Sequence, residues 1–413
     1  MKKRIKYEIS EIGEVIGGAT PSTKDEDNYG GDIPWITPKD LSSFKERYIY
    51  RGERNISEKG LNSCSAKLMP KNTVLFSSRA PIGYVAIAAN ELCTNQGFKS
   101  IIADETKINF LYLYYYLIYK KGEIEAVASG TTFKEVSGSV LKKFNIEIPE
   151  SILEQKAIAA TLSCLDDIIE LNNRTNKVLE EIAQAIFKRW FVDFEFPNED
   201  GEPYKSSGGE MVDSELGEIP KGWRVVELGD VTTNIRERTK SNDYKVLSAV
   251  NTGDLKLSEE YFTKQVFSKD LSKYIIVRIK EFAYNPARVN IGSIGMNEYD
   301  FDGCVSPVYV VFKSEEDFHW FFKMFIKTKN FKSEVVKRAS GSVRQSMNYS
   351  DFALIKIVYP PKGVIVKFNQ FFETCYLAQR EFTKEMEILS DIRDTLLPKL
   401  MSGEIRVPVE EVV

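Results

Sequence analysis

The chain repeats its own order of short motifs, and this repeat restricts the possible folds more than any other feature of the sequence. The copies match at offsets of 209 to 216 positions along 413 residues. The matched segments are 12–15 (Ile-Gly-Glu-Val) with 228–231 (Leu-Gly-Asp-Val), 79–83 (Arg-Ala-Pro-Ile-Gly) with 288–292 (Arg-Val-Asn-Ile-Gly), Cys93 with Cys304, 129–131 with 340–342, 148–149 with 359–360, and Leu179 and Ile182 with Leu389 and Ile392. We therefore expect a pseudo-twofold internal repeat of two units rather than one large domain.

Each copy ends in a long amphipathic segment. Apolar and small residues step by three and four along 153–190, which is the spacing of a coiled-coil seam. At 1.5 Å per residue, a helix over this segment would reach about 57 Å. The expected seam positions are Ile158, Leu162, Leu165, Ile169, Asn172, Asn176, Leu179 and Ile186 in the first helix, and Phe382, Leu389, Ile392 and Leu396 in the second, which we expect to end at Pro398. We expect an antiparallel coiled coil whose two asparagines fix its register; two unrelated amphipathic helices are the alternative.

The fold class expected is α+β, with two mixed α/β globular segments that are each followed by a long helix. Residues 196–222 are rich in Pro, Gly, Ser and acidic residues, which is typical of a linker. The boundaries that follow are a first globular segment at 1–150, its helix at 151–196, a linker at 197–222, a second globular segment at 223–362, its helix at 363–405 and a tail at 406–413.

The net charge of −4 hides an uneven distribution along the chain. Basic and acidic residues number 21 and 19 in 1–150, 6 and 15 in 151–220, 23 and 17 in 221–362, and 6 and 9 in 363–413. The globular segments are thus basic and the helical segments and linker acidic. This pattern directs contact with phosphate to the globular segments, and a solvated charge pattern without function is the alternative.

Residue usage excludes several chemistries. No two glycines are two positions apart, so the glycine turns of dinucleotide sites and of most S-adenosylmethionine sites are missing, and no glycine pair five apart is followed by Lys as in a P-loop. The only histidine is His319, within an aromatic run that favours a packing role, and no Cys-x-x-Cys pair occurs. We therefore expect no metal, no cofactor and no catalytic residue in this chain, although 60 acidic residues could still supply a carboxylate pair.

Five scattered cysteines and the lack of an apolar signal core near the first residue favour a reducing cytoplasm, with no membrane association.

Several motifs together carry a family resemblance. In the first copy these are 18–22 (Gly-Ala-Thr-Pro-Ser), 31–35 (Gly-Asp-Ile-Pro-Trp), 94–98 (Thr-Asn-Gln-Gly-Phe), 129–132 (Ser-Gly-Thr-Thr), 148–149 and 154–158 (Glu-Gln-Lys-Ala-Ile); near the C-terminus it is 396–405 (Leu-Leu-Pro-Lys-Leu-Met-Ser-Gly-Glu-Ile). In this order they resemble the specificity (S) subunit of type I restriction-modification systems over essentially the whole chain. The second copy has 234–240 (Asn-Ile-Arg-Glu-Arg-Thr-Lys) and Ser306-Pro307 where the first has its opening and central motifs. Its target sequence should therefore differ.

The resemblance implies a non-catalytic subunit with two target recognition domains, one for each half of a split, asymmetric DNA target. It implies that the helices act as a spacer and as the docking surface for two methyltransferase subunits, with two restriction subunits where the system has them. S-adenosylmethionine, ATP and Mg would then belong to the partner subunits. The alternatives are the specificity subunit of a combined restriction-methylation enzyme that cuts on both sides of its site, a tandem-repeat scaffold protein without a DNA role, and an unrecognised enzyme.

Base reading favours Arg, Lys, Asn and Gln, with Ser and Thr as adaptable partners, on loops that a rigid scaffold supports. The candidate DNA-binding residues are Thr20, Ser22, Lys24, Arg79, Thr132 and Lys134 in the first copy, and Arg236, Arg238, Lys240, Arg288, Asn290, Arg344 and Gln345 in the second. Arg79 and Arg288 occupy the same place in both copies, so we expect them to hold phosphate or the fold rather than to read a base. For Asn95 and Gln96 we expect hydrogen bonds to backbone groups in a turn.

Overall fold

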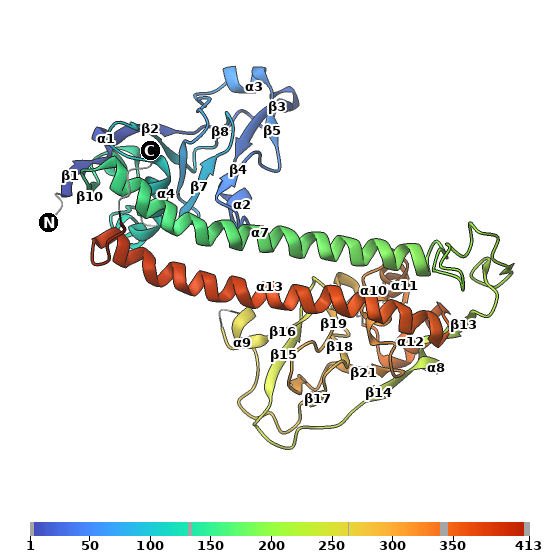
Figure 1. The fold of residues 1–413 in the computed structure, drawn as a ribbon. Coiled ribbons are helices and arrows are strands. Elements are labelled where there is room, and N and C mark those ends of the chain that lie inside the picture. Colours follow the sequence, from blue (N-terminus) through green and yellow to red (C-terminus); the bar gives the residue numbers. More distant parts are fainter. Residues whose placement is uncertain (1–3, 131–133, 263, 339–345, 409–413) are drawn as a thin grey trace. The chain divides into compact units, whose positions relative to one another are not determined.

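A computed structural model describes residues 4–130, 134–262, 264–338 and 346–408 (Figure 1). The chain forms two compact units. Unit 1 comprises Met1–Thr175 and Glu381–Val413, and unit 2 comprises Asn176–Arg380. Both are mixed α/β, and each contains part of the two long helices α7 (Ile152–Phe191) and α13 (Lys362–Ser402). Among the residues described, no helix has the long apolar run that a membrane span requires.

Unit 1 is built on three sheets. Its elements, besides parts of α7 and α13, are β1 (Arg4–Glu8), α1 (Ile9–Ile12), β2 (Gly13–Gly17), η1 (Glu26–Asn28), β3 (Tyr29–Ile36), α2 (Pro38–Leu41), β4 (Tyr48–Ile49), β5 (Asn55–Ile56), α3 (Glu58–Asn62), β6 (Val74–Ser78), β7 (Ile82–Ala88), β8 (Cys93–Thr94), β9 (Lys99–Ala103), α4 (Phe110–Tyr119), α5 (Lys121–Ala126), α6 (Gly138–Lys142) and β10 (Asn145–Pro149). The sheets have the orders β2-β9-β6-β7-β4, β5-β3-β8 and β1-β10.

The central strand β6 shows why this unit folds as it does. All five of its residues are buried, because both faces of the sheet are covered. Val74 and Phe76 point into one core with helix α4, whereas Leu75 points into another with Phe98. This alternation is the period of two expected of a strand, and it holds the loops at the ends of β2, β6 and β9 on a rigid sheet.

In unit 1, α7 and α13 meet through an apolar cluster and through two buried polar residues of α7, Asp166 and Asn172. Ile158 and Leu162 of α7 share a core with Leu400 and Met401 of α13. Asp166 of α7, almost fully buried, accepts hydrogen bonds from Arg393 of α13 at 2.7 Å and from the Tyr115 hydroxyl at 2.5 Å. The expected seam residue Asn172 is also buried and donates to Glu385 Oε2 at 2.8 Å.

Two details of the predicted second helix are wrong. The helix does not end at Pro398 but continues to Ser402, within the expected bounds of 363–405. Leu400 and Met401 beyond the proline are buried in the core, and the proline removes one helical hydrogen bond. Ile392 does not lie in the seam: its side chain is 42% exposed, and the neighbouring Arg393 takes the inner position opposite Asp166.

Unit 2 has the same α/β character and an aromatic core. Its elements, besides parts of α7 and α13, are β11 (Met211–Val212), β12 (Ile219–Pro220), β13 (Arg224–Glu227), α8 (Leu228–Val231), β14 (Thr232–Ile235), β15 (Lys245–Ala249), β16 (Leu255–Leu257), α9 (Ser258–Tyr261), β17 (Ile275–Val277), β18 (Phe282–Tyr284), η2 (Val289–Ile291), β19 (Ile294–Met296), β20 (Gly303–Val305), β21 (Val310–Ser314), α10 (His319–Phe325), α11 (Lys329–Arg338), α12 (Tyr349–Ala353) and β22 (Lys356–Tyr359). The sheets have the orders β14-β21-β18-β19, β16-β15-β20-β17, β13-β22 and β11-β12.

The long helices close the core of unit 2 with aromatic rings. Phe187 and Phe191 of α7 lie 6.0 and 5.0 Å, between ring centroids, from Phe368 of α13. Phe282 of β18 stacks on Phe312 of β21 at 5.1 Å in the same cluster. Burial of so many large rings is the main stabilising contribution here.

In both units the strand that precedes a candidate loop pairs antiparallel with a later strand. β2 pairs antiparallel with β9 in unit 1, where Gly13 faces Ala103 and Gly17 faces Lys99. β14 pairs antiparallel with β21 in unit 2, where Thr232 faces Ser314. An offset of 211 relates Ala103 to Ser314, and the same offset places Val310 where unit 1 has Lys99.

Candidate nucleic-acid interface

In unit 1 the loop after β2 presents three of the predicted residues to solvent. Thr20, Ser22 and Lys24 are all exposed. Two side chains of β3 hold the loop backbone. Trp35 Nε1 donates to the Ala19 carbonyl at 3.0 Å, and the Tyr29 hydroxyl donates to the Pro21 carbonyl at 2.8 Å. The predicted side chains can therefore face a ligand while the backbone that carries them stays in place.

The turn after β8 packs directly against this loop. A Cβ on Gly18 would lie 2.1 Å from the Asn95 carbonyl oxygen, so only glycine permits this approach. Asn95 Oδ1 accepts a hydrogen bond from the Gly97 N–H at 2.9 Å, which confirms its expected role in the turn. Gln96 differs from the expectation: its side chain is exposed, and its amide oxygen accepts a hydrogen bond from the Thr20 hydroxyl.

A charged cluster lies beside these two loops. Glu135 Oε2 is 3.5 Å from Arg79 Nη1, and Glu135 Oε1 is 3.5 Å from Lys99 Nζ. Lys99 Nζ is also 3.4 Å from the Gln96 carbonyl oxygen. We call Arg79, Lys99 and Glu135 the Glu135 cluster. Contacts therefore run from Thr20 through Gln96 and Lys99 to Glu135 and Arg79, and they join segments that are far apart in the sequence.

Backbone hydrogen bonds fix the relative positions of the segments that carry the Glu135 cluster. The Ser78 N–H donates to the Gly97 carbonyl at 2.7 Å, and the Ser78 carbonyl accepts from the Val136 N–H at 3.0 Å. Lys134, a predicted residue, is exposed next to Glu135. Thr132, also predicted, lies outside the described residues.

Sequence reasoning missed Lys99 and Glu135, and it did not predict that the Gln96 side chain has a side-chain partner. Lys99 directly follows the 94–98 motif and Glu135 follows the 129–132 motif, so their positions beside family motifs were the available signal.

In unit 2 the predicted segment 236–240 runs beside β17. Arg236, Arg238 and Lys240 are exposed, whereas Thr239 is buried and donates its hydroxyl hydrogen to the Leu271 carbonyl at 2.5 Å. The Thr239 N–H donates to the Tyr274 carbonyl at 3.0 Å. The alternation of exposed and buried residues places Arg238 and Lys240 on the side opposite the buried Thr239.

A second loop of unit 2, between β18 and β19, carries Arg288 and Asn290. Arg288 is exposed and Asn290 is half-buried, while Val289 between them is buried. Ile291 is 61% exposed on the same loop, and Val308, after Ser306-Pro307, is 66% exposed. Arg344 and Gln345 lie outside the described residues.

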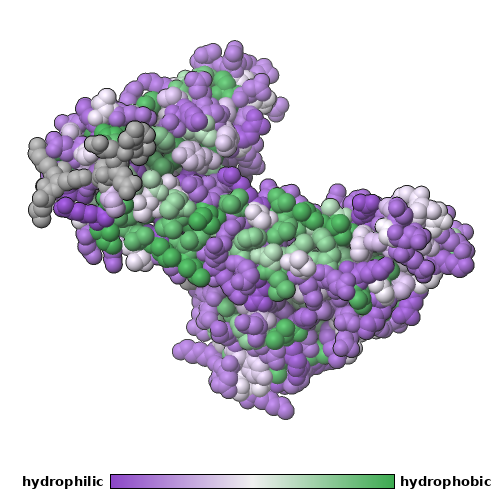
Figure 2. All heavy atoms as spheres, viewed as in Figure 1, coloured by the Kyte–Doolittle hydropathy of each residue, from purple (hydrophilic) through white to green (hydrophobic). Residues whose placement is uncertain are grey.

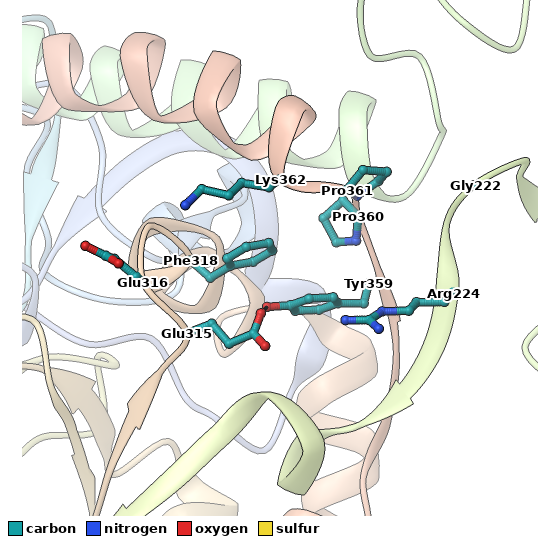
Figure 3. A pocket seen from close by; sticks show the side chains of 9 residues that line it. All are labelled: Gly222, Arg224, Glu315, Glu316, Phe318, Tyr359, Pro360, Pro361 and Lys362. Atoms are coloured by element: carbon teal, nitrogen blue, oxygen red, sulfur yellow. Dashed lines mark hydrogen bonds between the residues drawn. The ribbon is translucent and has the colours of Figure 1, made fainter.

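One pocket of unit 2 lies beside the tyrosine Tyr359. The pocket in Figure 3 encloses about 370 Å³ between Tyr359 and the start of α13. The Tyr359 hydroxyl donates to Glu315 Oε2 at 2.7 Å, and burial together with this carboxylate raises the pKa of Tyr359 far above its usual range. At neutral pH this phenol stays protonated, and Lys362 nearby is paired with Asp317 at 2.9 Å.

His319 packs against Trp320 at 4.8 Å between ring centroids, as its aromatic surroundings predict. Burial, with a contribution from Lys280, lowers the pKa of His319 to about 4. The imidazole is therefore neutral near pH 7. In the part of the chain that the structure describes, no group of three or more His, Cys, Asp or Glu side chains could hold a metal ion.

The family model and the known proteins that are similar to this chain are all specificity domains or specificity subunits of type I restriction systems. Residues 1–181 match the family model of the type I restriction modification DNA specificity domain. The type I restriction enzyme MjaIX specificity subunit of Methanocaldococcus jannaschii is 37% identical over 97% of this chain and 93% of its own length. The type I restriction enzyme HindI specificity subunit of Haemophilus influenzae is 24% identical over 66% of this chain and 72% of its own. In fold, the chain is similar to the type I restriction-modification S subunit from M. genitalium, with a TM-score of 0.59, 16% identity and 96% coverage of both chains.

Proposed function

Because the chain belongs to the family of type I restriction-modification specificity subunits, we propose that it selects the DNA target of a methyltransferase and restriction complex and performs no chemistry itself. Unit 1 reads one half of a split, asymmetric target and unit 2 reads the other. The observation that carries this proposal is the series of contacts in unit 1 that joins Thr20, Gln96, Lys99, Glu135 and Arg79. Loops on a rigid sheet with polar and cationic side chains are suited to contacts with base edges and phosphates.

Within unit 1, we assign phosphate contact to Arg79 and Lys134, and base reading to Thr20, Ser22 and Lys24, with Thr132 as a further candidate. A hydroxyl can donate to or accept from either purine or pyrimidine edges, and Lys24 can donate to guanine. The exposure of all three described loop residues supports this assignment.

Within unit 2, base reading falls to Arg236, Arg238 and Lys240, and phosphate contact to Arg288; Asn290, Arg344 and Gln345 complete the candidates. The two exposed arginines at 236 and 238 have the fork geometry that suits guanine. Because unit 1 has no arginine at the corresponding loop, the two half-sites should differ in sequence.

We propose that α7 and α13 form an antiparallel coiled coil that sets the distance between the half-sites, within a pseudo-twofold repeat. Contacts inside each unit support it: Asp166 with Arg393 in unit 1, and Gln379 Nε2 with the Asn176 carbonyl at 2.9 Å in unit 2. Recognition domains that read one face of a duplex must lie about one helical turn, about 34 Å, or a multiple of it apart.

The same helices expose apolar side chains that suit a helical partner. Figure 2 shows apolar residues along α7 and α13. In unit 1 the exposed positions are Ile168, Leu171, Ile388 and Ile392. A cluster of exposed aliphatic side chains on long helices is typical of a protein interface, and we assign it to two methyltransferase subunits, with restriction subunits joining through them. S-adenosylmethionine, ATP and Mg are then cofactors of those partners.

Co-expression with a methyltransferase subunit tests the function directly. The chain is expressed with this partner in a host that lacks its own adenine methylation, and modified adenines are mapped across the host DNA. We expect one split, asymmetric motif that disappears when the chain is omitted. A partner that methylates with another specificity subunit but leaves no motif with this chain would contradict the proposal.

A further inference from the structure

Glu135 occupies a position in unit 1 that a phosphate group could take. Its two carboxylate oxygens face two different cations, Arg79 at 3.5 Å and Lys99 at 3.5 Å. The side chains of Glu135 and Arg79 are each 36% exposed, so solvent and a ligand can reach both. The geometry is that of one anion shared by two cations at the edge of the predicted DNA-reading loops.

Lys99 is held in place before any ligand arrives. Its side chain is only 15% exposed, although it carries a charge. Its methylene stem runs between two glycines: a Cβ on Gly17 would lie 4.0 Å from Lys99 Cδ, and a Cβ on Gly138 would lie 3.7 Å from it. The Gln96 carbonyl then orients the ammonium group at 3.4 Å. A lysine fixed in this way loses little side-chain entropy when it binds an anion.

The ion pairs that hold Glu135 are weak enough to exchange. Partly exposed pairs at such distances contribute about 0.2–1 kcal/mol each. A DNA phosphate that meets the same two cations gains, in addition, from the release of counterions. The balance therefore favours phosphate once DNA is bound, and favours Glu135 in the free protein.

We propose that Arg79 and Lys99 form a binding site for one DNA backbone phosphate, and that Glu135 fills this site in the free protein and is displaced when DNA binds. The inference rests on the proposed function, because it takes unit 1 to be a DNA-reading unit. Glu135 thereby lowers affinity for DNA in general, so that only a target with enough correct base contacts remains bound.

The sequence of unit 2 does not repeat this arrangement at the positions that correspond to Lys99 and Glu135. At the offset of 211, Val310 stands in place of Lys99 and Ser346 in place of Glu135. Unit 2 therefore keeps an arginine, Arg288, in this region but has neither the second cation nor the carboxylate at the corresponding positions. The two half-sites should differ in how strongly a single carboxylate limits their affinity.

The test compares Glu135→Gln with Glu53→Gln in the full chain bound to its methyltransferase partner. Glu53 is an exposed carboxylate of the same unit that pairs with Lys39 at 2.6 Å. Both variants remove one negative charge, but Glu53→Gln frees one lysine whereas Glu135→Gln frees Lys99 and Arg79. Affinity for a duplex carrying the mapped target and for a random duplex is measured at several salt concentrations. We expect Glu135→Gln to bind both duplexes about 2- to 30-fold more tightly, the factor that the loss of two weak ion pairs permits, and Glu53→Gln to change affinity less than 2-fold.

Lys99→Met, which keeps the stem and removes the charge, completes the comparison. Combined with Glu135→Gln, it should abolish the gain in affinity. An unchanged or lower affinity of Glu135→Gln would overturn the proposal, and a loss restricted to the target duplex would instead make Glu135 a base-reading residue. If the unaltered complex binds target and random duplexes equally, the proposed function fails rather than the phosphate site. Inorganic phosphate at the same ionic strength should not compete, because it cannot make the neighbouring contacts.

Discussion

Units 1 and 2 hold the same pair of long helices by different chemistry. In unit 1 buried polar groups join the helices, with Asp166 bound to Arg393 and Tyr115, and Asn172 bound to Glu385. In unit 2 aromatic rings do so, with Phe187 and Phe191 around Phe368. Aromatic packing tolerates small shifts, whereas a buried ion pair requires one register. The polar contacts of unit 1 therefore define how the helices align, and the rings of unit 2 supply stabilising burial.

The candidate loops of the two units also differ in chemistry. In unit 1 the candidate side chains, from Thr20 to Arg79, contact one another through hydrogen bonds and ion pairs. In unit 2 arginines lie together with the exposed aliphatic residues Ile291 and Val308. In both units the strand before the loop pairs antiparallel with a later strand. Similar strand pairs thus carry chemically different loop side chains, as expected if a rigid scaffold holds variable contact residues.

The largest expected effect is on the aromatic contact. Phe368→Ala should lower the free energy of unfolding by about 3–5 kcal/mol, because a fully buried ring leaves a cavity. The loss should be the same at low and at high salt, as chemical denaturation at two ionic strengths would check. If the loss of unfolding free energy became markedly smaller at high salt, the contact between the helices in unit 2 would not be purely apolar, and the contrast with unit 1 would fail.

Asp166→Ala should cost slightly less, about 3 kcal/mol, because it leaves Arg393 half-buried without its principal partner. Asp394→Ala is the matched control: Asp394 also pairs with Arg393 at 2.9 Å, but it is 66% exposed where Asp166 is 7%. The control should cost less than about 1 kcal/mol. Equal losses in denaturation experiments would mean that burial of the pair does not matter.

Arg288→Ala should weaken DNA binding by about 1–2 kcal/mol for target and random duplexes alike, since a phosphate contact carries no base information. The slope of log affinity against log salt should fall by about one. Titrations at four salt concentrations measure both. A loss of affinity that depends on one base pair would make Arg288 a base-reading residue. Arg288 would then not share the phosphate contact proposed for Arg79.

The smallest effect concerns Val308. If its exposed methyl groups contact a thymine methyl, Val308→Thr should reduce preference for thymine over uracil at one position of the unit 2 half-site by about 0.8 kcal/mol, the value of one methylene group. Duplexes with uracil at each thymine in turn provide the measurement. No change at any position would show that Val308 does not contact a thymine methyl group.

The long helices and the position of residues 20–24 on a loop could be read from the sequence, because both depend on local pattern. The seam spacing over 153–190 corresponds to α7, Ile152–Phe191. The expected end at Pro398 was wrong, because the burial of Leu400 and Met401, which carries the helix to Ser402, depends on residues at the other end of the chain. Lys99 and Glu135 were missed for the same reason: they are 36 positions apart, and only the folded sheet makes them neighbours.

Unit 1 is discontinuous, and this affects the timing of its folding during synthesis. Its core includes Leu400 and Met401, and Arg4 of its first strand donates to the Met401 carbonyl at 2.6 Å. Unit 2, residues 176–380, lies between the two parts. At about 5–20 residues per second, the ribosome needs about 10–40 s to make that intervening segment. The first part of unit 1 must therefore wait in an incomplete state while unit 2 emerges whole, so a chaperone would find its substrate in the segment that is translated first.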